Sequence, residues 1–177
     1  MAKPFIGIKK LWYGDPLTTE QAASLTAATA VATLTNSLTE IKNVHQGTWG
    51  YSQDDPSVTD YINELSGQPY YRDKEDLGAR TINFTLGVYD FATKAALQGG
   101  TVIGQEAGWK SSDTLENVYK TIVAQTKTGN YIVFSNASIV AKGDQQEKNI
   151  GLGITAVCME SENTGVAAEY MFTAAAA

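Results

Sequence analysis

Residues 80–103 constrain the fold most, because a strand pattern passes into a helix pattern there without a break. Residues 81–88 alternate strictly, and a period of two predicts a strand with one buried face. The apolar positions are Ile82, Phe84, Leu86 and Val88. The positions between them are Thr81, Asn83, Thr85 and Gly87. We expect the first set to point into a core and the second to point away from it.

A short α-helix is predicted directly after this strand. Asp90 is a favourable N-cap, residues 91–98 are rich in helix formers, and Gly99 and Gly100 end the pattern. The alanines of this segment predict a small-residue face that lies close on another element, with Phe91 as its larger anchor.

The rest of the chain is a succession of short strand patterns. They cover residues 5–13, 40–51, 58–64, 68–72, 101–108, 117–125, 130–140, 150–159 and 167–172. Residues 17–37, rich in Thr and Ala, predict a turn or two of helix over 19–25, after a weak capping box at Thr18 and Gln21, and then a loop. We therefore expect a mainly-β fold: a β-sandwich or barrel of short antiparallel strands with one flanking short α-helix at about 90–98. The 177 residues suit a single domain, 1–177.

Composition argues against several functions. The net charge of −6 disfavours binding to a phosphate backbone, and no apolar run approaches the length of a membrane span. Cys158 is the only cysteine and is expected as a buried strand thiol, while the single His45 is expected as a polar strand residue. Because no catalytic or metal-binding motif is present, we expect no enzyme, no cofactor and no metal. The absence of a signal peptide pattern predicts folding in the cytoplasm.

The order of elements resembles a known family. The strand, acidic N-cap, Ala-rich helix and GGTV strand start of residues 80–103 are similar to the pattern in tail tube proteins of long-tailed bacteriophages. The likeness extends to the N-terminal strand IGIKKLWYG and the last hairpin, GLGITAVCMES with AEYMF. The resemblance implies a virion structural protein, assembled in the host cytoplasm, whose hexameric rings stack into a tube. Its partners would be further copies and other phage tail proteins, with DNA passing through the lumen unbound. Tubes of type VI secretion and contractile injection systems share this fold family and remain an alternative.

Two residue sets follow as candidates. The lumen-facing candidates are Thr81, Asn83 and Thr85, although an ordinary solvent face explains their polarity equally well. The subunit-interface candidates are the aromatic residues Trp12, Tyr13, Trp49, Tyr51, Tyr70 and Tyr71. The first strand carries apolar residues on both faces, so we expect a neighbouring subunit to cover one of them. Alternatively, the same aromatic residues would supply the stacking surface of a carbohydrate- or ligand-binding β-sandwich module.

Overall fold

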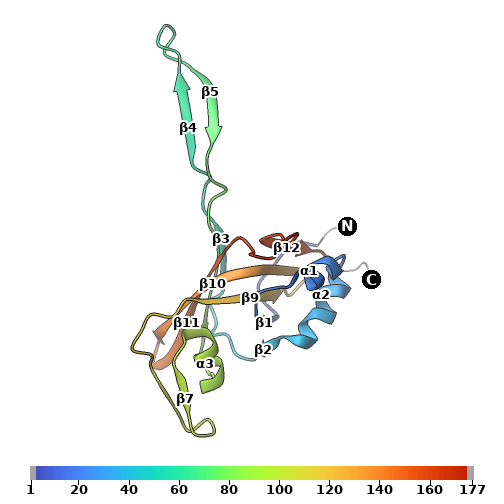
Figure 1. Ribbon diagram of the computed structural model, residues 1–177, viewed down its shortest axis with the longest axis vertical. Helices are drawn as coiled ribbons and strands as arrows, with labels where there is room; N and C mark the ends of the chain where they lie inside the picture. Colours follow the sequence, from blue (N-terminus) through green and yellow to red (C-terminus); the bar gives the residue numbers. More distant parts are fainter. Residues whose placement is uncertain (1–2, 175–177) are drawn as a thin grey trace.

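The computed structural model describes residues 3–174 as a mainly-β body from which one hairpin projects as a long arm (Figure 1). Eight strands form an antiparallel sheet in the order β2-β1-β9-β10-β11-β6-β3, with β12 paired to β10. The strands of the sheet are β1 (Lys10–Gly14), β2 (Thr39–Ile41), β3 (Gly50–Gln53), β6 (Arg80–Leu86), β9 (Val118–Gln125), β10 (Tyr131–Gln146), β11 (Asn149–Cys158) and β12 (Glu169–Phe172). The hairpins outside the sheet are β4 (Val58–Ile62) with β5 (Pro69–Lys74) and β7 (Thr101–Ile103) with β8 (Gly108–Lys110).

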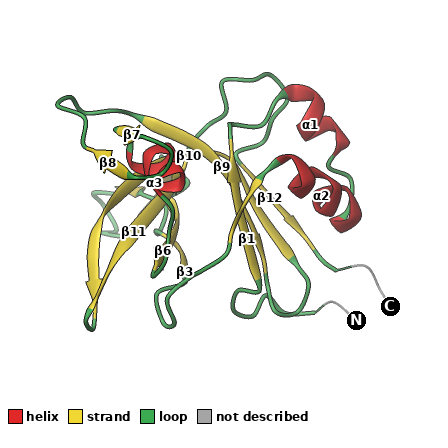
Figure 2. Ribbon diagram, turned by 90° about the horizontal axis from the view of Figure 1, so that it is seen from below, coloured by secondary structure: helices red, strands yellow, loops and turns green. Residues whose placement is uncertain are grey.

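Strand β10 divides the sheet into two halves (Figure 2). Its first residues, Tyr131 to Phe134, pair with both β9 and β12. The register with β9 then shifts between Phe134 and Ala137, and from Ala137 onward β10 pairs with β11. Bulges of this kind bend a strand and raise its twist. The predicted mainly-β, antiparallel fold is confirmed, but the sheet is not a closed barrel within residues 3–174, because the end strands β2 and β3 do not pair.

The main hydrophobic core lies against both halves of the sheet. Its fully buried side chains include Leu11 of β1, Phe84 of β6 and Phe134 of β10. The alternation predicted for β6 is confirmed for Ile82, Phe84 and Leu86, whose exposed fractions are 0–1%. Val88 does not follow, since the strand ends at Leu86 and Val88 lies in the exposed connection to the next helix.

A second core corrects the prediction for residues 17–37. This segment forms α1 (Thr19–Ser24), α2 (Ala28–Leu34) and a 3₁₀ turn (Thr35–Ser37), where a loop was expected after the first helical turns. The predicted capping box of Thr18 and Gln21 is confirmed. Buried residues of α2 recur every three positions, Ala28, Val31 and Leu34, which places them on one helix face. Threonine and alanine at the intervening positions concealed this period.

The second core also explains the first strand. Leu11 and Tyr13 point into the main core, whereas Trp12 packs with Leu17 and Val31 in the second core. The expectation that a neighbouring subunit covers one face of this strand is therefore wrong for β1, because α1 and α2 of the same chain cover that face.

Helix α3 (Phe91–Gln98) has the predicted boundaries. Asp90 accepts a hydrogen bond from the Thr93 backbone N–H at 2.7 Å, and Gly99 ends the helix with a φ of 85°. The predicted anchor is wrong: Leu97 is fully buried in the main core, whereas Phe91 is half-buried. Leucine at position 97 can reach the core because it lies on the sheet side of the last turn.

Several boundaries also differ from the predictions. The strand expected over residues 40–51 is divided into β2 and β3 by a loop that contains His45, and residues 101–108 form a strand and a turn that lead into β8. The polar turn expected near residues 142–149 is reduced to Glu147 and Lys148, because β10 continues to Gln146. Glu147 accommodates this tight turn with a φ of 55°.

The cap of α3 gives a first prediction. Asp90→Ala should lower the free energy of unfolding by about 1 kcal/mol at neutral pH, because a free N–H of the first helical turn loses its acceptor. Asp90→Asn, which keeps an acceptor oxygen, is the matched control. It should lower the free energy of unfolding by only a few tenths of the loss expected for Asp90→Ala. Urea denaturation of the three proteins measures both differences, and equal stability for Asp90→Ala and the wild type would contradict the capping role.

The same carboxylate predicts a pH dependence. Hydrogen bonds from Thr93, the side chain first and then the backbone, lower the pKa of Asp90 below its ordinary value. A carboxyl group with a lowered pKa in the folded state contributes stability above its unfolded pKa, and this contribution is lost as pH falls through the folded value. The stability difference between wild type and Asp90→Asn should therefore shift in favour of the Asn variant below about pH 4. A difference that stays constant between pH 7 and pH 2 would contradict this assignment.

Candidate assembly surfaces

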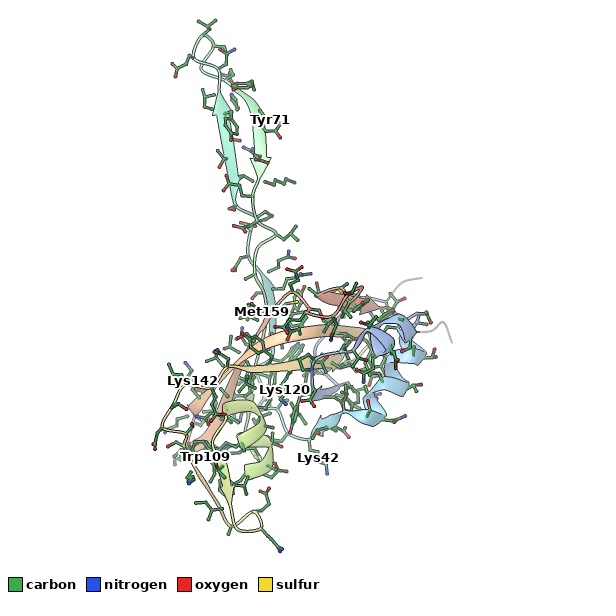
Figure 3. The ribbon with its side chains drawn as sticks, in the orientation of Figure 1. Lys42, Tyr71, Trp109, Lys120, Lys142 and Met159 are labelled. Carbon is green, nitrogen blue, oxygen red and sulfur yellow. The ribbon has the colours of Figure 1, made fainter. Side chains whose placement is uncertain are left out.

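The arm consists of residues 54–79, between β3 and β6, and projects away from the body (Figures 1 and 3). Strands β4 and β5 pair only with each other, and every residue from Asp60 to Leu77 is exposed. Within the arm, Arg72 donates two hydrogen bonds to the Asp60 carboxylate, at 2.6 and 2.8 Å, and the Tyr61 and Tyr71 rings lie 5.8 Å apart. The two predicted strands about Ser66 and Gly67 are thus confirmed as a hairpin.

The arm exposes several large apolar side chains. Leu65 at its tip is 97% exposed and Tyr70 is 70% exposed. The other large exposed side chains are Val58, Tyr61, Ile62, Tyr71 and Leu77. A two-stranded hairpin without a further layer is marginally stable in water, and several exposed large apolar side chains on one such element indicate an interaction site.

The arm also carries most of the net charge of the protein. Its seven carboxylates against Arg72 and Lys74 give −5 of the total −6, which leaves −1 for the remainder. The carboxylates are Asp54, Asp55, Asp60, Glu64, Asp73, Glu75 and Asp76. Like charges therefore oppose contact between two arms, and the arm is repelled by phosphate groups of nucleic acid or anionic lipid.

A second candidate surface is the outer face of the half-sheet formed by β10, β11, β6 and β3. Residues opposite each other in an antiparallel pair share a face, so the registers define this surface. Thr81 is opposite Ser52 and Val157, and Asn83 is opposite Gly50 and Thr155. We call this set the polar face: Ser52, Thr81, Asn83, Ser138, Val140, Thr155 and Val157. These seven residues are uncharged, but the same sheet face continues through Thr85 and Gly153 to Lys142 and Asp144, so a lysine and an aspartate border the polar face.

The three lumen-facing candidates have different environments. Asn83 is exposed and Thr81 is half-buried, both on the polar face. Thr85 is 5% exposed, because its hydroxyl donates to Asp144 Oδ2 at 2.8 Å and its backbone N–H donates to Thr48 Oγ1 at 3.0 Å. Hydrogen bonds from Gln146 and then Thr85 lower the pKa of Asp144. Thr85 thus holds a structural hydrogen bond and contributes little accessible surface.

The six aromatic interface candidates do not converge on one site. Trp12 and Tyr13 are each 7% exposed, so little of either is available to another molecule. Trp49 packs on the main core, with its ring 6.5 Å from that of Phe84. Tyr51 stands at the root of the arm, and only Tyr70 and Tyr71 lie on the arm itself (Figure 3). These positions give no common aromatic surface on which a sugar ring could stack.

A groove of about 520 Å³ lies between β2 and the turn before α3, a feature that the sequence analysis missed. Ile41, Lys42, Leu86, Val88 and Asp90 are among its lining residues. Figure 3 places Lys42 at the end of the molecule opposite to Tyr71 of the arm. The one available signal was Val88, an apolar residue beyond the end of its strand. An apolar projection and a groove therefore occupy opposite ends of the molecule.

The described residues contain little that suggests chemistry. No group of three or more His, Cys, Asp and Glu in residues 3–174 is arranged to hold a metal ion. Burial raises the pKa of the Cys158 thiol to about 11, so it stays protonated and is a poor nucleophile at neutral pH. No helix in this part of the chain combines the length and the apolar character needed to cross a membrane.

Comparison with known proteins finds no matching family model and no matching curated protein.

The separation of the arm from both cores gives a prediction about stability. Gln53 and Arg80 are paired across the root, so an Asn-Gly turn can replace residues 54–79 as a two-residue hairpin. Because no side chain of the arm belongs to either core, this variant should melt within about 4 °C of the wild type, the shift expected for roughly 1 kcal/mol or less. Leu97→Ala, which truncates a side chain of the main core, is the comparison variant. It should lower the free energy of unfolding by about 2–5 kcal/mol. Loss of cooperative unfolding in the armless protein would show that the body depends on the arm.

Proposed function

We propose that this protein is the structural subunit of a self-assembling tube, of the kind that forms the tail tube of long-tailed bacteriophages. The subunits would form six-membered rings that stack, and DNA would pass through the lumen. The observation that carries the proposal is the arm, an exposed, apolar and acidic hairpin that no part of its own chain covers within residues 3–174. The family resemblance of residues 80–103 supports the same function.

The chemistry of the arm favours a protein partner. Its net charge of −5 disfavours nucleic acid and anionic membranes, while its Leu and Tyr side chains need an apolar surface. Another copy of the chain offers such a surface at the opposite end of the molecule, in the groove beside Val88. Contact between unlike surfaces of identical subunits is heterologous: it forms a ring where the rotation between copies closes and an open filament where it does not.

The sheet supports ring formation and a lumen. Strands β2 and β3 are open edges, and pairing such edges between neighbouring subunits removes the hazard of unpaired strands. The polar face suits the wall of a DNA channel, because uncharged Thr, Asn and Ser side chains release no counterions and so do not retain a phosphate backbone. A tube of a type VI secretion or contractile injection system would use the same surfaces.

Electron microscopy and light scattering of the purified protein test assembly directly. The wild type should form rings or tubes as its concentration rises, without ligand, metal or nucleotide. The armless variant, with residues 54–79 replaced by Asn-Gly, should remain folded but form no tubes. A wild-type protein that stays monomeric at high concentration would contradict the proposal, and so would an armless variant that still forms tubes.

A further prediction concerns the lumen. Asn83 and Thr155 are cross-strand neighbours on the polar face, and replacing both with Lys would place a repeated ring of positive charge on that face. Tubes of Asn83→Lys/Thr155→Lys should retain short duplex DNA at low salt and release it as salt rises, whereas wild-type tubes should not retain it.

The control adds the same charge elsewhere. Ala23 of α1 and Thr29 of α2 are exposed on the helical side of the body. Tubes of Ala23→Lys/Thr29→Lys should bind DNA on their outside, where nuclease can digest it, whereas DNA held in the lumen should be protected. Equal nuclease sensitivity of the DNA on both variants would contradict assignment of the polar face to the lumen.

A further inference from the structure

The root of the arm lies where two strands of the sheet, β3 and β12, are not paired with each other. Strands β3 and β6 pair with each other up to Gln53 and Arg80, and β6 pairs with β11 up to Thr81. Strand β12, in the other half of the sheet, pairs with β10. No backbone pairing joins β3 to β12 in the described chain. Within the described residues, β3 is therefore connected to β12 through the ladders of β6, β11 and β10 and not by a direct backbone hydrogen bond.

One side chain bridges this opening. Glu169 of β12 accepts a hydrogen bond from the Tyr51 hydroxyl at 2.8 Å through Oε1, and one from Arg80 Nη1 at 2.9 Å through Oε2. Tyr51 belongs to β3 and Arg80 to β6, so a single carboxylate holds both strands that carry the arm. We call these three residues the root clamp.

The root clamp is partly removed from water. The Arg80 and Glu169 side chains are 23% and 12% exposed, in contrast to the Arg72 and Asp60 pair of the arm at 61% and 33%. Screening by solvent is weaker for such a pair than for one at the surface. Burial, followed by the hydrogen bond to Glu169, raises the pKa of Tyr51 to about 12, so its hydroxyl keeps the proton that it donates at neutral pH.

The geometry of the strands directs all three side chains to the same place. Tyr51 is opposite Ile82 and Arg80 is two residues before it, so both share the core-facing side of the half-sheet with Ile82. Glu169 is opposite Phe134, a main-core residue, and the Tyr51 ring lies 6.2 Å from the Phe134 ring. The root clamp therefore closes the rim of the main core where the two halves of the sheet separate.

We propose that Glu169 is a positioning residue that fixes the direction of the arm, so that the arm is presented in one orientation to the neighbouring copy. Loss of the bridge leaves the cores intact but lets the arm swing about the end of the β6-β11 ladder. The importance of this orientation for assembly rests on the proposed function, whereas the positioning itself does not.

Distance measurement between spin labels tests the positioning in dilute, monomeric protein. Labels at Leu65 of the arm tip and Thr29 of α2 are both on exposed residues, and a Cys158→Ser background removes the native thiol while keeping a donor for the Ala168 carbonyl. The parent protein should give one narrow distance distribution. Glu169→Ala should broaden it at least twofold, and Glu169→Gln, which keeps an acceptor oxygen without the charge, should be intermediate.

Matched variants separate positioning from stability. Glu162→Ala removes a carboxylate from an exposed loop and should leave the distribution unchanged. Tyr51→Phe and Arg80→Lys each weaken one side of the bridge and should broaden the distribution less than Glu169→Ala. If Glu169→Ala fails to fold, Tyr51→Phe and Arg80→Lys still test the proposal. An unchanged distribution in Glu169→Ala, or in both Tyr51→Phe and Arg80→Lys, would overturn the proposal.

Assembly supplies a second and separate readout. If the tube function holds, Glu169→Ala should raise the concentration needed for assembly at least tenfold, at a melting temperature that still indicates a folded body. Broadening of the distance distribution in a protein whose wild type never assembles would support the root clamp and reject the tube. Normal assembly together with a broadened distribution would show that the orientation of the arm does not limit assembly, and would overturn that part of the proposal.

Discussion

The structure depends on the division of β10 between two sets of partners. Its first residues hold β12, its last ten hold β11, and β9 pairs with it on both sides of the bulge after Phe134. Because one strand serves both halves of the sheet, the halves cannot separate, and their inner faces enclose the main core. The bulge bends β10 and raises its twist between the two halves.

This arrangement determines which surfaces remain free. The outer face of the first half is covered by α1 and α2, which form the second core around Trp12 and Val123. The outer face of the other half is left open and carries the polar face. The arm leaves the body at the rim between the halves, where the root clamp ties it across the opening. The open sheet face and the arm, which we propose as assembly surfaces, are thus both consequences of one shared strand.

The parts that could be predicted from sequence are those with a local physical signal. The alternation of β6, the Asp90 cap and the Gly99 end of α3 each depend on neighbours within a few residues, and each was located correctly. The arm hairpin was also found, but its isolation was not: its many carboxylates favour exposure, whereas its Val, Ile, Leu and Tyr residues are equally typical of a hairpin packed on a core. Helix α2 was missed since alanine and threonine weaken the contrast between its two faces.

The candidate residues show the same limit. Asn83 was placed on the correct face, because a strand period fixes the side of the sheet. The burial of Trp12 and Tyr13 could not be predicted, since it depends on helices whose docking is a tertiary event. The role of Glu169 could not be predicted from the sequence either. Its two partners are 118 and 89 residues away in sequence, and only the fold brings them within hydrogen-bond distance.

Hydrogen–deuterium exchange of the arm tests the central claim most directly, because it follows the arm itself in both the dilute and the concentrated protein. In dilute protein the amides of β4 and β5 should exchange far faster than those of β9 and β10, as expected for an uncovered hairpin. In concentrated protein that has formed rings or tubes, the same arm amides should become strongly protected while those of β9 and β10 change little. Arm amides that exchange rapidly in every state of the protein would contradict the claim that the arm is an assembly surface.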